Sequence, residues 1–340
     1  MLGKWSILFF SLVAACLLFI GCGGETARNP IEPGGEIPPL LATLPDGVYL
    51  AIGHLDIDRL VGSEIGRELL DSLSLANLML AAQGIDLRNG FHELAFAVGF
   101  VGRAYPNLVH ALPAIAVLRA DIKPETVLTL LQAGETETFR IGANEVIRFR
   151  IDIPRMGNLI SGAGFLSFPQ EGVTVLSTSR DLLEQYLEHR DDGAEGIGGS
   201  KSAAMLARAD KRVPGWMVMR HSEESRSLLQ MLAGFEDCII SVDAGEALEI
   251  LCVLDFPTAD AAEESIKYSD YTRRQLERFK EKAEADQDYE KLAGDISLNF
   301  MLAFEAERSA DLAIYSARFN REWFSRIGNI QPPQPEEEQQ

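Results

Sequence analysis

Two cysteines on one predicted β-hairpin are the residues best placed to react with each other. Cys238 and Cys252 lie in the alternating apolar stretches DCIISV and ALEILCVL, which predict two antiparallel strands with both thiols on one face. In the predicted register Cys238 opposes Cys252, and Ile240 opposes Ile250. Directly opposed Cβ atoms lie about 4.5 to 5.5 Å apart, slightly beyond the usual separation in a disulfide. Three interpretations stay open: a disulfide formed after a mild adjustment, two buried thiols packed as hydrophobic groups, and a reactive dithiol.

The common signatures of catalytic and metal-binding sites are missing from the sequence. Its five histidines include no pair at the spacing of HExxH, and the nucleophile motif GxSxG does not occur. The stretch GAEGIGGSKS looks like a phosphate loop, but Glu195 and Ser200 stand where that motif requires glycine. Carboxylates are so numerous that no pair can be singled out as a general acid and base. The sequence therefore predicts no catalytic residue, no cofactor and no metal site.

A cluster of arginines on the longest predicted helix could contact a partner. The helix begins near Thr258 and has only a narrow apolar stripe, which is typical of a helix with one face on a sheet and the rest in water. Arg273, Arg274 and Arg278 give this helix a local excess of positive charge on an otherwise acidic chain. The three arginines define a candidate partner face for an acidic protein or for lipid headgroups. The simpler interpretation is that they are only solvated.

The first residues of the chain have the layout of a secretory signal. Lys4 precedes the apolar run WSILFFSLVAACLLFI, and small residues follow it. At about 16 residues the run is shorter than the roughly 20 that a membrane-spanning helix needs. The stretch LFIGC, which ends at Cys22, resembles the lipobox of bacterial lipoproteins, with Phe19 where that pattern usually has leucine. The stretch VAAC, which ends at Cys16, also fits the lipobox but would leave an apolar core of only about eight residues, so Cys22 is the predicted site. An uncleaved anchor and ordinary cleaved secretion are the alternatives.

The resemblance to a lipobox implies a location. Cleavage would make Cys22 the first residue of the mature protein, and a lipid on its sulfur would hold the chain at a bilayer, because two or more acyl chains bind a membrane firmly. In bacterial lipoproteins Gly23, as the residue behind the cysteine, favours the outer membrane. The stretch LPDGVYLAIGHLDIDRL (44–60) also loosely resembles uncharacterised exported bacterial α+β proteins. That second resemblance implies no activity.

The charge of the chain argues against one class of partner. Of its 340 residues, 31 are Lys or Arg and 51 are Asp or Glu, which gives a net charge of −20. Nucleic-acid binding depends on Lys and Arg contacts to phosphates, so we predict that this protein binds no nucleic acid. A membrane, through the N-terminal lipid, and an envelope protein are the predicted partners, and a small-molecule ligand is unknown.

Two blocks of the sequence show the same predicted order of elements, βαββαβ. The first opens with the turn and strand PDGVYLAIGHLDI, and the second opens with PGWMVMRH. This is the ferredoxin-like order, and its repetition suggests an internal duplication. We therefore predict an α+β fold of two ferredoxin-like blocks, with mainly antiparallel sheets and helices packed on one face.

The composition divides the chain into six predicted segments. The stretch after Cys22 and the last ten residues are rich in Gly, Pro, Gln and Glu, and cannot bury enough apolar surface to fold. The predicted segments are a signal peptide (1–21), a flexible tether (22–40), a first α+β block (41–158), a connecting hairpin-helix segment (159–212), a second α+β block (213–329) and a disordered acidic tail (330–340).

The function favoured by these features is that of a membrane-tethered envelope lipoprotein that binds or scaffolds without catalysis. One alternative is an exported hydrolase whose site is assembled from scattered Asp, Glu and His residues. Another is a carrier of apolar molecules in a cavity between sheet and helices. The predicted fold does not separate these functions, because ferredoxin-like sheets support many.

Overall fold

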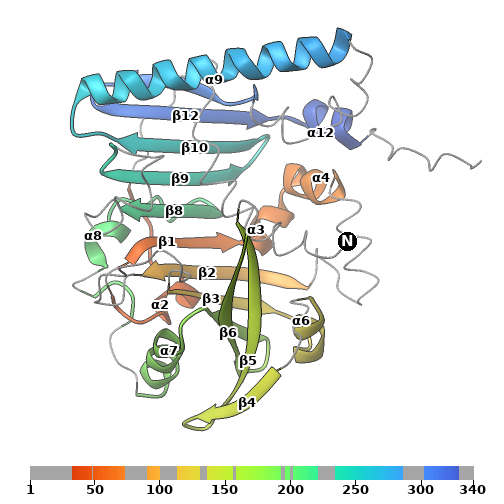
Figure 1. The fold of residues 1–340 in the computed structure, drawn as a ribbon, viewed down its shortest axis with the longest axis vertical. Helices are drawn as coiled ribbons and strands as arrows, with labels where there is room; N and C mark the ends of the chain where they lie inside the picture. Colours follow the sequence, from red (N-terminus) through yellow and green to blue (C-terminus); the bar gives the residue numbers. More distant parts are fainter. Residues whose placement is uncertain are drawn as a thin grey trace, which may run out of the picture.

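The strands of this protein form one large antiparallel sheet (Figure 1). The computed structural model describes residues 33–47, 49–72, 90–99, 113–130, 136–155, 158–192, 196–199, 202–220, 234–285 and 302–328. Within these residues the sheet has twelve strands in the order β11-β12-β10-β9-β8-β1-β2-β3-β7-β6-β5-β4. The strands are β1 (Tyr49–Asp56), β2 (Phe91–Gly99), β3 (Ala114–Ala120), β4 (Thr136–Ile141), β5 (Asn144–Arg155), β6 (Asn158–Gln170), β7 (Val173–Ser177), β8 (Gly215–Arg220), β9 (Asp237–Ala244), β10 (Leu248–Asp255), β11 (Glu305–Ser309) and β12 (Leu312–Phe319).

Several helices begin at a residue whose side chain caps the first turn. Asp56 accepts a hydrogen bond from the backbone N–H of Arg59 at 2.9 Å, and Thr258 accepts one from Ala261 at 3.2 Å. These contacts satisfy backbone donors that have no partner inside the helix. The helices are α2 (Pro39–Ala42), α3 (Ile57–Gly62), α4 (Glu64–Ser72), α6 (Pro124–Leu130), α7 (Arg180–Asp192), α8 (Ala203–Leu206), α9 (Ala259–Ala285) and α12 (Arg321–Gly328). Of these, α2 and α8 have no such hydrogen bond from a capping side chain.

Both faces of the middle of the sheet are buried. Along β8, Trp216 and Val218 belong to a first core, which also contains side chains of α2, α7 and α8. Met217 and Met219 point to the other face and belong to a second core with side chains of α4, α9 and α12. Helices therefore cover both faces of the sheet, and the prediction that they pack on one face is corrected. An apolar run such as residues 215–219 of β8 is typical of a strand buried on both sides.

The α+β class and the antiparallel sheet are confirmed, whereas the two ferredoxin-like blocks are not. In a split βαβ unit the two strands joined by a helix are separated by another strand. Here β1 pairs directly with β2, and β8 pairs directly with β9. Strand and helix patterns in the sequence give the order of elements, but each strand could pair with several others. Tertiary packing decides which neighbour it takes.

The two predicted blocks meet at their first strands. β1 pairs with β8, and Gly53 lies opposite Met217 at the centre of this ladder. From this pair the strands run outward in sequence order, through β2 and β3 on one side and through β9 and β10 on the other. A Cβ atom at Gly53 would lie 2.3 Å from the ring of Phe96 and 3.0 Å from the carbonyl oxygen of Trp216. The sheet thus continues across the predicted boundary at 212/213.

The connecting hairpin also joins this sheet, and the helix that follows packs against it. β6 and β7 form the predicted hairpin, and they lie between β3 and β5. α7 follows, and its buried side chains Leu183, Tyr186 and Leu187 complete the first core. Within the residues that the structure describes, no helix is both long and apolar enough to span a bilayer.

Candidate functional site

The hairpin β9–β10 brings the two cysteines together, but in a different register from the predicted one. Cys252 pairs with Ile240, and Cys238 pairs with Leu254. The predicted direct opposition of Cys238 and Cys252 is therefore wrong. The reason is the turn: Ala244 pairs with Leu248, so residues 245–247 form the loop, and alternation along a strand does not fix the loop length.

The thiols nevertheless lie near each other on one face. Both cysteines are buried in the second core as diagonal neighbours, and their sulfur atoms are 3.8 Å apart. The structure contains them as two thiols, not as a disulfide. They contribute apolar packing in this form, and the predicted bridge stays a prediction.

Helix α9 separates the three arginines that were predicted to share a face. Arg273 is partly buried, and its Nε donates to Glu277 Oε1 at 3.0 Å. Arg274 and Arg278 are exposed, and among the described residues no acidic side chain forms an ion pair with either. Two of the three predicted residues therefore face solvent together, and the third lies at the edge of the packed side.

Two tyrosines that the sequence analysis missed lie on the same exposed side of α9. Tyr268 is 69% exposed and Tyr271 is 61% exposed, and they are the large apolar side chains that stand out as exposed in the described part of the chain. Tyr271, Arg274 and Arg278 are three and four residues apart, so they are neighbours on the helix surface. We call Tyr268, Tyr271, Arg274 and Arg278 the α9 surface. The signal in the sequence was the position of both tyrosines outside the apolar stripe.

The opposite side of α9 fixes the orientation of this surface. Ala262 is buried in the second core, and Ser265 Oγ lies 2.8 Å from Tyr315 Oη of β12. Arg308 of β11 forms an ion pair of 3.6 Å with Glu263. α9 therefore lies along the β11–β12 end of the sheet, as Figure 1 shows, and the side that carries Tyr268 and Tyr271 is exposed among the described residues.

A buried polar network crosses β1, β2 and β3. His54 Nε2 lies 2.8 Å from Glu93 Oε1, and Arg119 lies 3.1 Å from the other oxygen of Glu93. Burial by itself would raise the pKa of the Glu93 carboxyl. The hydrogen bond with His54, the charges of His54 and Arg119 and a hydrogen bond from the backbone of Leu40 together lower this pKa.

This network resembles the carboxylate–histidine pairs of acid–base catalysis, but it lies inside the protein. His54 and Glu93 are each 6% exposed. The second ring nitrogen of His54 and the Nε1 of Trp216, which is the β8 partner of His54, are buried without a hydrogen-bond partner among the described residues. The arrangement accounts for structural specificity, not for access by a substrate.

A second histidine joins α3 to the ends of β2 and β3. His92 Nδ1 lies 2.9 Å from Asp58 Oδ1, and His92 Nε2 lies 3.2 Å from Asp121 Oδ2. The hydrogen bond with Asp58 raises the pKa of His92, and Asp121 adds to this effect, although burial opposes it. Both ring nitrogens donate when the imidazole is protonated, so the cationic form fits this position best.

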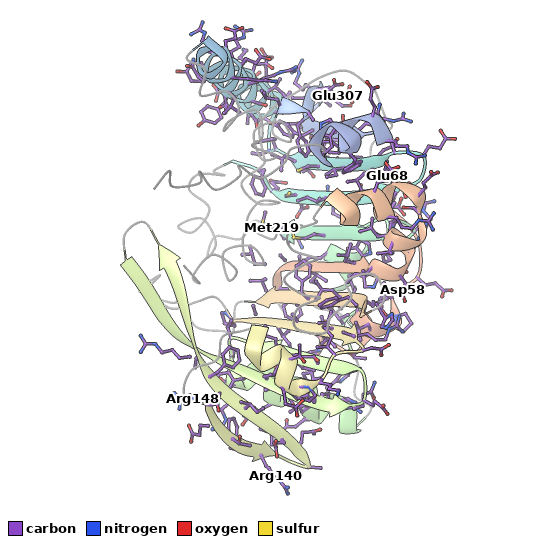
Figure 2. The ribbon with its side chains drawn as sticks, turned by 90° about the vertical axis from the view of Figure 1, so that its right-hand side faces the viewer. Asp58, Glu68, Arg140, Arg148, Met219 and Glu307 are labelled. Carbon is purple, nitrogen blue, oxygen red and sulfur yellow. The ribbon has the colours of Figure 1, made fainter. Side chains whose placement is uncertain are left out.

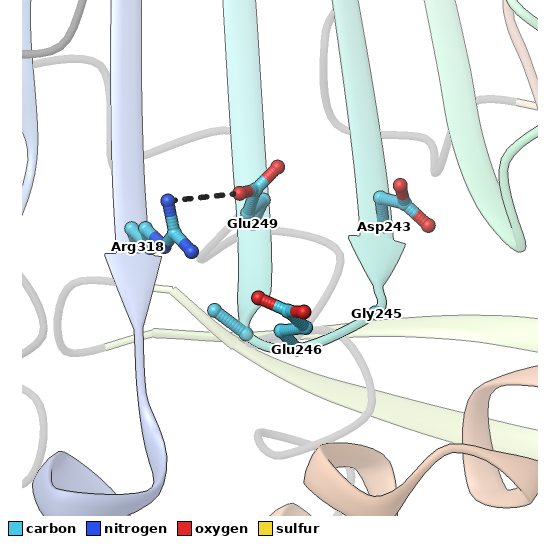
Figure 3. A pocket seen from close by; sticks show the side chains of 6 residues that line it. Asp243, Gly245, Glu246, Glu249 and Arg318 are labelled. Atoms are coloured by element: carbon cyan, nitrogen blue, oxygen red, sulfur yellow. Dashed lines mark ion pairs between the residues drawn. The ribbon is translucent and has the colours of Figure 1, made fainter.

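A small polar pocket of about 240 Å³ lies at the β9–β10 turn (Figure 3). Asp243, Glu246 and Glu249 line it together with Arg318, which forms an ion pair of 3.7 Å with Glu249. The excess of carboxylates favours a basic group over an anion. Within the described ranges no cluster of three His, Cys, Asp or Glu side chains has an arrangement that could hold a metal ion. Cys22 and its flanking residues lie outside the described residues.

Comparisons with known proteins assign neither a family nor an activity. No family model and no curated protein matches this chain. The chain is similar to a solved structure described as "Structure of crystal form I of TP0453", with 6% sequence identity and a TM-score of 0.38. The similarity covers 90% of this chain and 100% of that one. A likeness this weak carries no argument about the fold or function of this protein.

Proposed function

We propose that this protein is a lipid-anchored lipoprotein of a bacterial cell envelope and that its folded part binds an acidic protein partner without catalysis. The observation that carries the binding role is the α9 surface. Tyrosine and arginine are the residue types most enriched at the energetic centres of protein interfaces, and α9 exposes two of each side by side. The positive charge of Arg274 and Arg278, on a chain of net charge −20, favours an acidic partner over a basic one.

The anchoring role rests on the sequence. The stretch LFIGC provides the lipidation site at Cys22, and the Gly- and Pro-rich residues 22–33 provide a tether between membrane and fold. This tether is shorter than the predicted 22–40, because Gly34 is hydrogen-bonded to Ala209 and Lys211, and Leu40 is buried in the first core. Several acyl chains are needed for stable anchoring, since each buried methylene contributes only about 0.8 kcal/mol. A diacylglycerol on the cysteine supplies them. The outer membrane is the proposed location because Gly23 follows the cysteine.

Metabolic labelling tests the anchor. Cells that express the full chain are grown with a clickable palmitate, and the protein is followed by in-gel fluorescence and membrane fractionation. Cys22→Ser should abolish the label and release the protein from the membrane fraction. Cys16→Ser is the matched control, because it removes the cysteine inside the apolar run and keeps Cys22. It should leave the labelling and the membrane association unchanged. Equal labelling of Cys22→Ser and wild type would reject lipidation at this residue.

Quantitative crosslinking tests the docking role. The double variant Arg274→Glu/Arg278→Glu should lose the envelope proteins that crosslink to the wild type. Arg140→Glu/Arg148→Glu is the control, because it changes the net charge equally at the opposite end of the molecule (Figure 2). Recovery of the same partners by both double variants would remove the α9 surface from the proposal and leave the anchor untouched.

A further inference from the structure

The α9 surface has the chemistry of a docking site for an acidic, proline-rich segment, and this chain carries such a segment. We propose that residues 330–340, the C-terminal tail, dock on the α9 surface of the same molecule. The tail lies outside the described residues, and its sequence is IQPPQPEEEQQ. Its three glutamates would pair with Arg274 and Arg278, and its prolines would contact Tyr268 and Tyr271.

The ion pairs along α9 leave Arg274 and Arg278 available to bind the glutamates of the tail. Lys267 lies 2.6 Å from Glu263, and Arg273 lies 3.0 Å from Glu277, so both form ion pairs within the helix. Arg274 and Arg278 form no ion pair with the residues that the structure describes. Guanidinium groups form their strongest hydrogen bonds with carboxylates, often two at a time. A run of three carboxylates is therefore a matching ligand.

The two tyrosines of the α9 surface suit the proline-rich part of the tail. Pro332, Pro333 and Pro335 favour the extended polyproline conformation, which has no internal hydrogen bonds and loses little entropy on binding. Proteins that bind such segments do so with exposed aromatic side chains. Tyr268 and Tyr271, three residues apart on α9, present two such rings.

The position of the last helix brings the tail within reach. Ser265 lies beside Tyr315, and Glu263 lies beside Arg308, which pairs with Ala313, so α9 and β12 run in the same direction. From Tyr315 to Phe319 the strand advances about 13 Å at roughly 3.3 Å per residue. At about 1.5 Å per residue, α9 covers that distance near Arg274.

The chain length beyond α12 is sufficient to close this distance. α12 starts directly after β12 and ends at Gly328. The eight or so residues from there to Glu336 can span about 26 Å when extended. The glutamates can therefore return to Arg274 and Arg278.

Docking within one molecule compensates for the weakness of the individual contacts. Exposed ion pairs stabilise little by themselves, and salt screens them. A short linker, however, holds the tail at an effective concentration in the millimolar range. The docked tail would occupy the surface proposed above for an acidic partner, so such a partner would have to displace it.

A site-specific photocrosslinker tests this placement in the full chain. Gln334 is replaced by p-benzoylphenylalanine, the purified protein is irradiated, and crosslinked peptides are identified by mass spectrometry. Crosslinks should concentrate in residues 264–281. Arg274→Glu/Arg278→Glu should lower their yield at least fivefold, and adding Glu336→Lys/Glu337→Lys/Glu338→Lys to that variant should restore it. The control Arg140→Glu/Arg148→Glu should leave the yield unchanged.

Four outcomes would overturn the proposal. They are crosslinks spread over other elements, a yield insensitive to Arg274→Glu/Arg278→Glu, an equal loss in the control variant, and no recovery with the lysine tail. A mixture of ¹⁴N- and ¹⁵N-labelled protein adds a fifth, because crosslinks formed mainly between differently labelled chains would assign the tail to a second copy. The experiment reads only the position of the tail, so its failure leaves the lipid anchor and partner binding open to their own tests.

Discussion

Replacing Glu93 by leucine should destabilise the fold strongly, because three donors lose one buried acceptor. The Glu93 carboxylate interacts with His54 at 2.8 Å, with Arg119 at 3.1 Å and with the backbone N–H of Leu40. His54 and Leu40 are buried, so water cannot replace the lost acceptor. The side chain of Arg119 is half exposed and can be solvated instead. Two buried donors therefore remain without a partner.

The expected size of the effect follows from this count. Hydrogen bonds to a charged group are worth about 1.5–3 kcal/mol, and removing one partner of a buried pair costs about 3–5 kcal/mol. We expect Glu93→Leu to lower the free energy of unfolding by about 3–4 kcal/mol. Glu93→Gln keeps the size and one acceptor, so about 1–2 kcal/mol is expected. Since domains are stable by only about 5–15 kcal/mol, the leucine variant should lose a large share of its stability.

Urea unfolding at pH 7, followed by circular dichroism, measures these differences. Glu137→Leu is the control, because Glu137 forms an exposed pair with Arg148 and should change stability by less than about 1 kcal/mol. The double variant His54→Leu/Glu93→Leu should be more stable than the two single losses predict, because it removes the orphaned donor as well. A loss below about 1 kcal/mol for Glu93→Leu, or strictly additive losses, would refute the reasoning.

The pH dependence gives an independent check on the same carboxylate. Its folded pKa lies below the usual value of 4.5. The stabilisation it provides is therefore fully present above that value and is lost as the pH falls through the lower folded pKa. The stability difference between wild type and Glu93→Gln should shrink as the pH is lowered from 6 to 3. A constant difference over this range would show that the charge of Glu93 does not contribute.

Three further measurements test other parts of the structure. Because the folded pKa of His92 is raised, the stability that its charge provides is complete below the usual pKa of 6.5 and is lost as the pH rises through the folded pKa. His92→Gln should therefore cost more stability at pH 5.5 than at pH 8.5. The opposite trend would contradict the contacts of His92 with Asp58 and Asp121. Iodoacetamide added during unfolding should alkylate both Cys238 and Cys252, whereas a protein 2 Da lighter that resists alkylation would establish the bridge. Gly53→Ala should cost about 1–3 kcal/mol in urea unfolding because its Cβ meets Phe96 and Trp216, and Gly245→Ala, which meets no atom within 4 Å, should be nearly neutral.

Local elements could be read from the sequence where one pattern dominated. The alternation in DCIISV and ALEILCVL predicted β9 and β10, and the helical spacing after Thr258 predicted α9. The partners of these strands could not be read in the same way. β1 and β8 were each assigned to their own block, yet they pair with each other, because a strand that is apolar on both faces can join a sheet at many places.

Only part of the candidate site could be predicted, because its exposure depends on tertiary packing. Arg274 and Arg278 were found because charge on a helix is visible in the sequence, whereas the tyrosines beside them were not. Tyrosine is found both buried and exposed in proteins, so the position of Tyr268 and Tyr271 outside the apolar stripe indicated exposure without establishing it. The packing of α9 on β12 shows that both face solvent. The His54–Glu93 pair was also missed, since residues 39 positions apart meet only when β1 and β2 pair.

The sequence by itself determined the periodicity of each element, the acidic balance of the chain and the lipobox pattern ahead of Cys22. These depend on neighbouring residues, or on sums over all of them. Only the tertiary structure decided the pairing of β1 with β8, the diagonal placement of Cys238 and Cys252 and the exposure of the α9 surface. Each of these depends on which distant segments pack together and exclude water, and the sequence of a single strand or helix does not specify its partner.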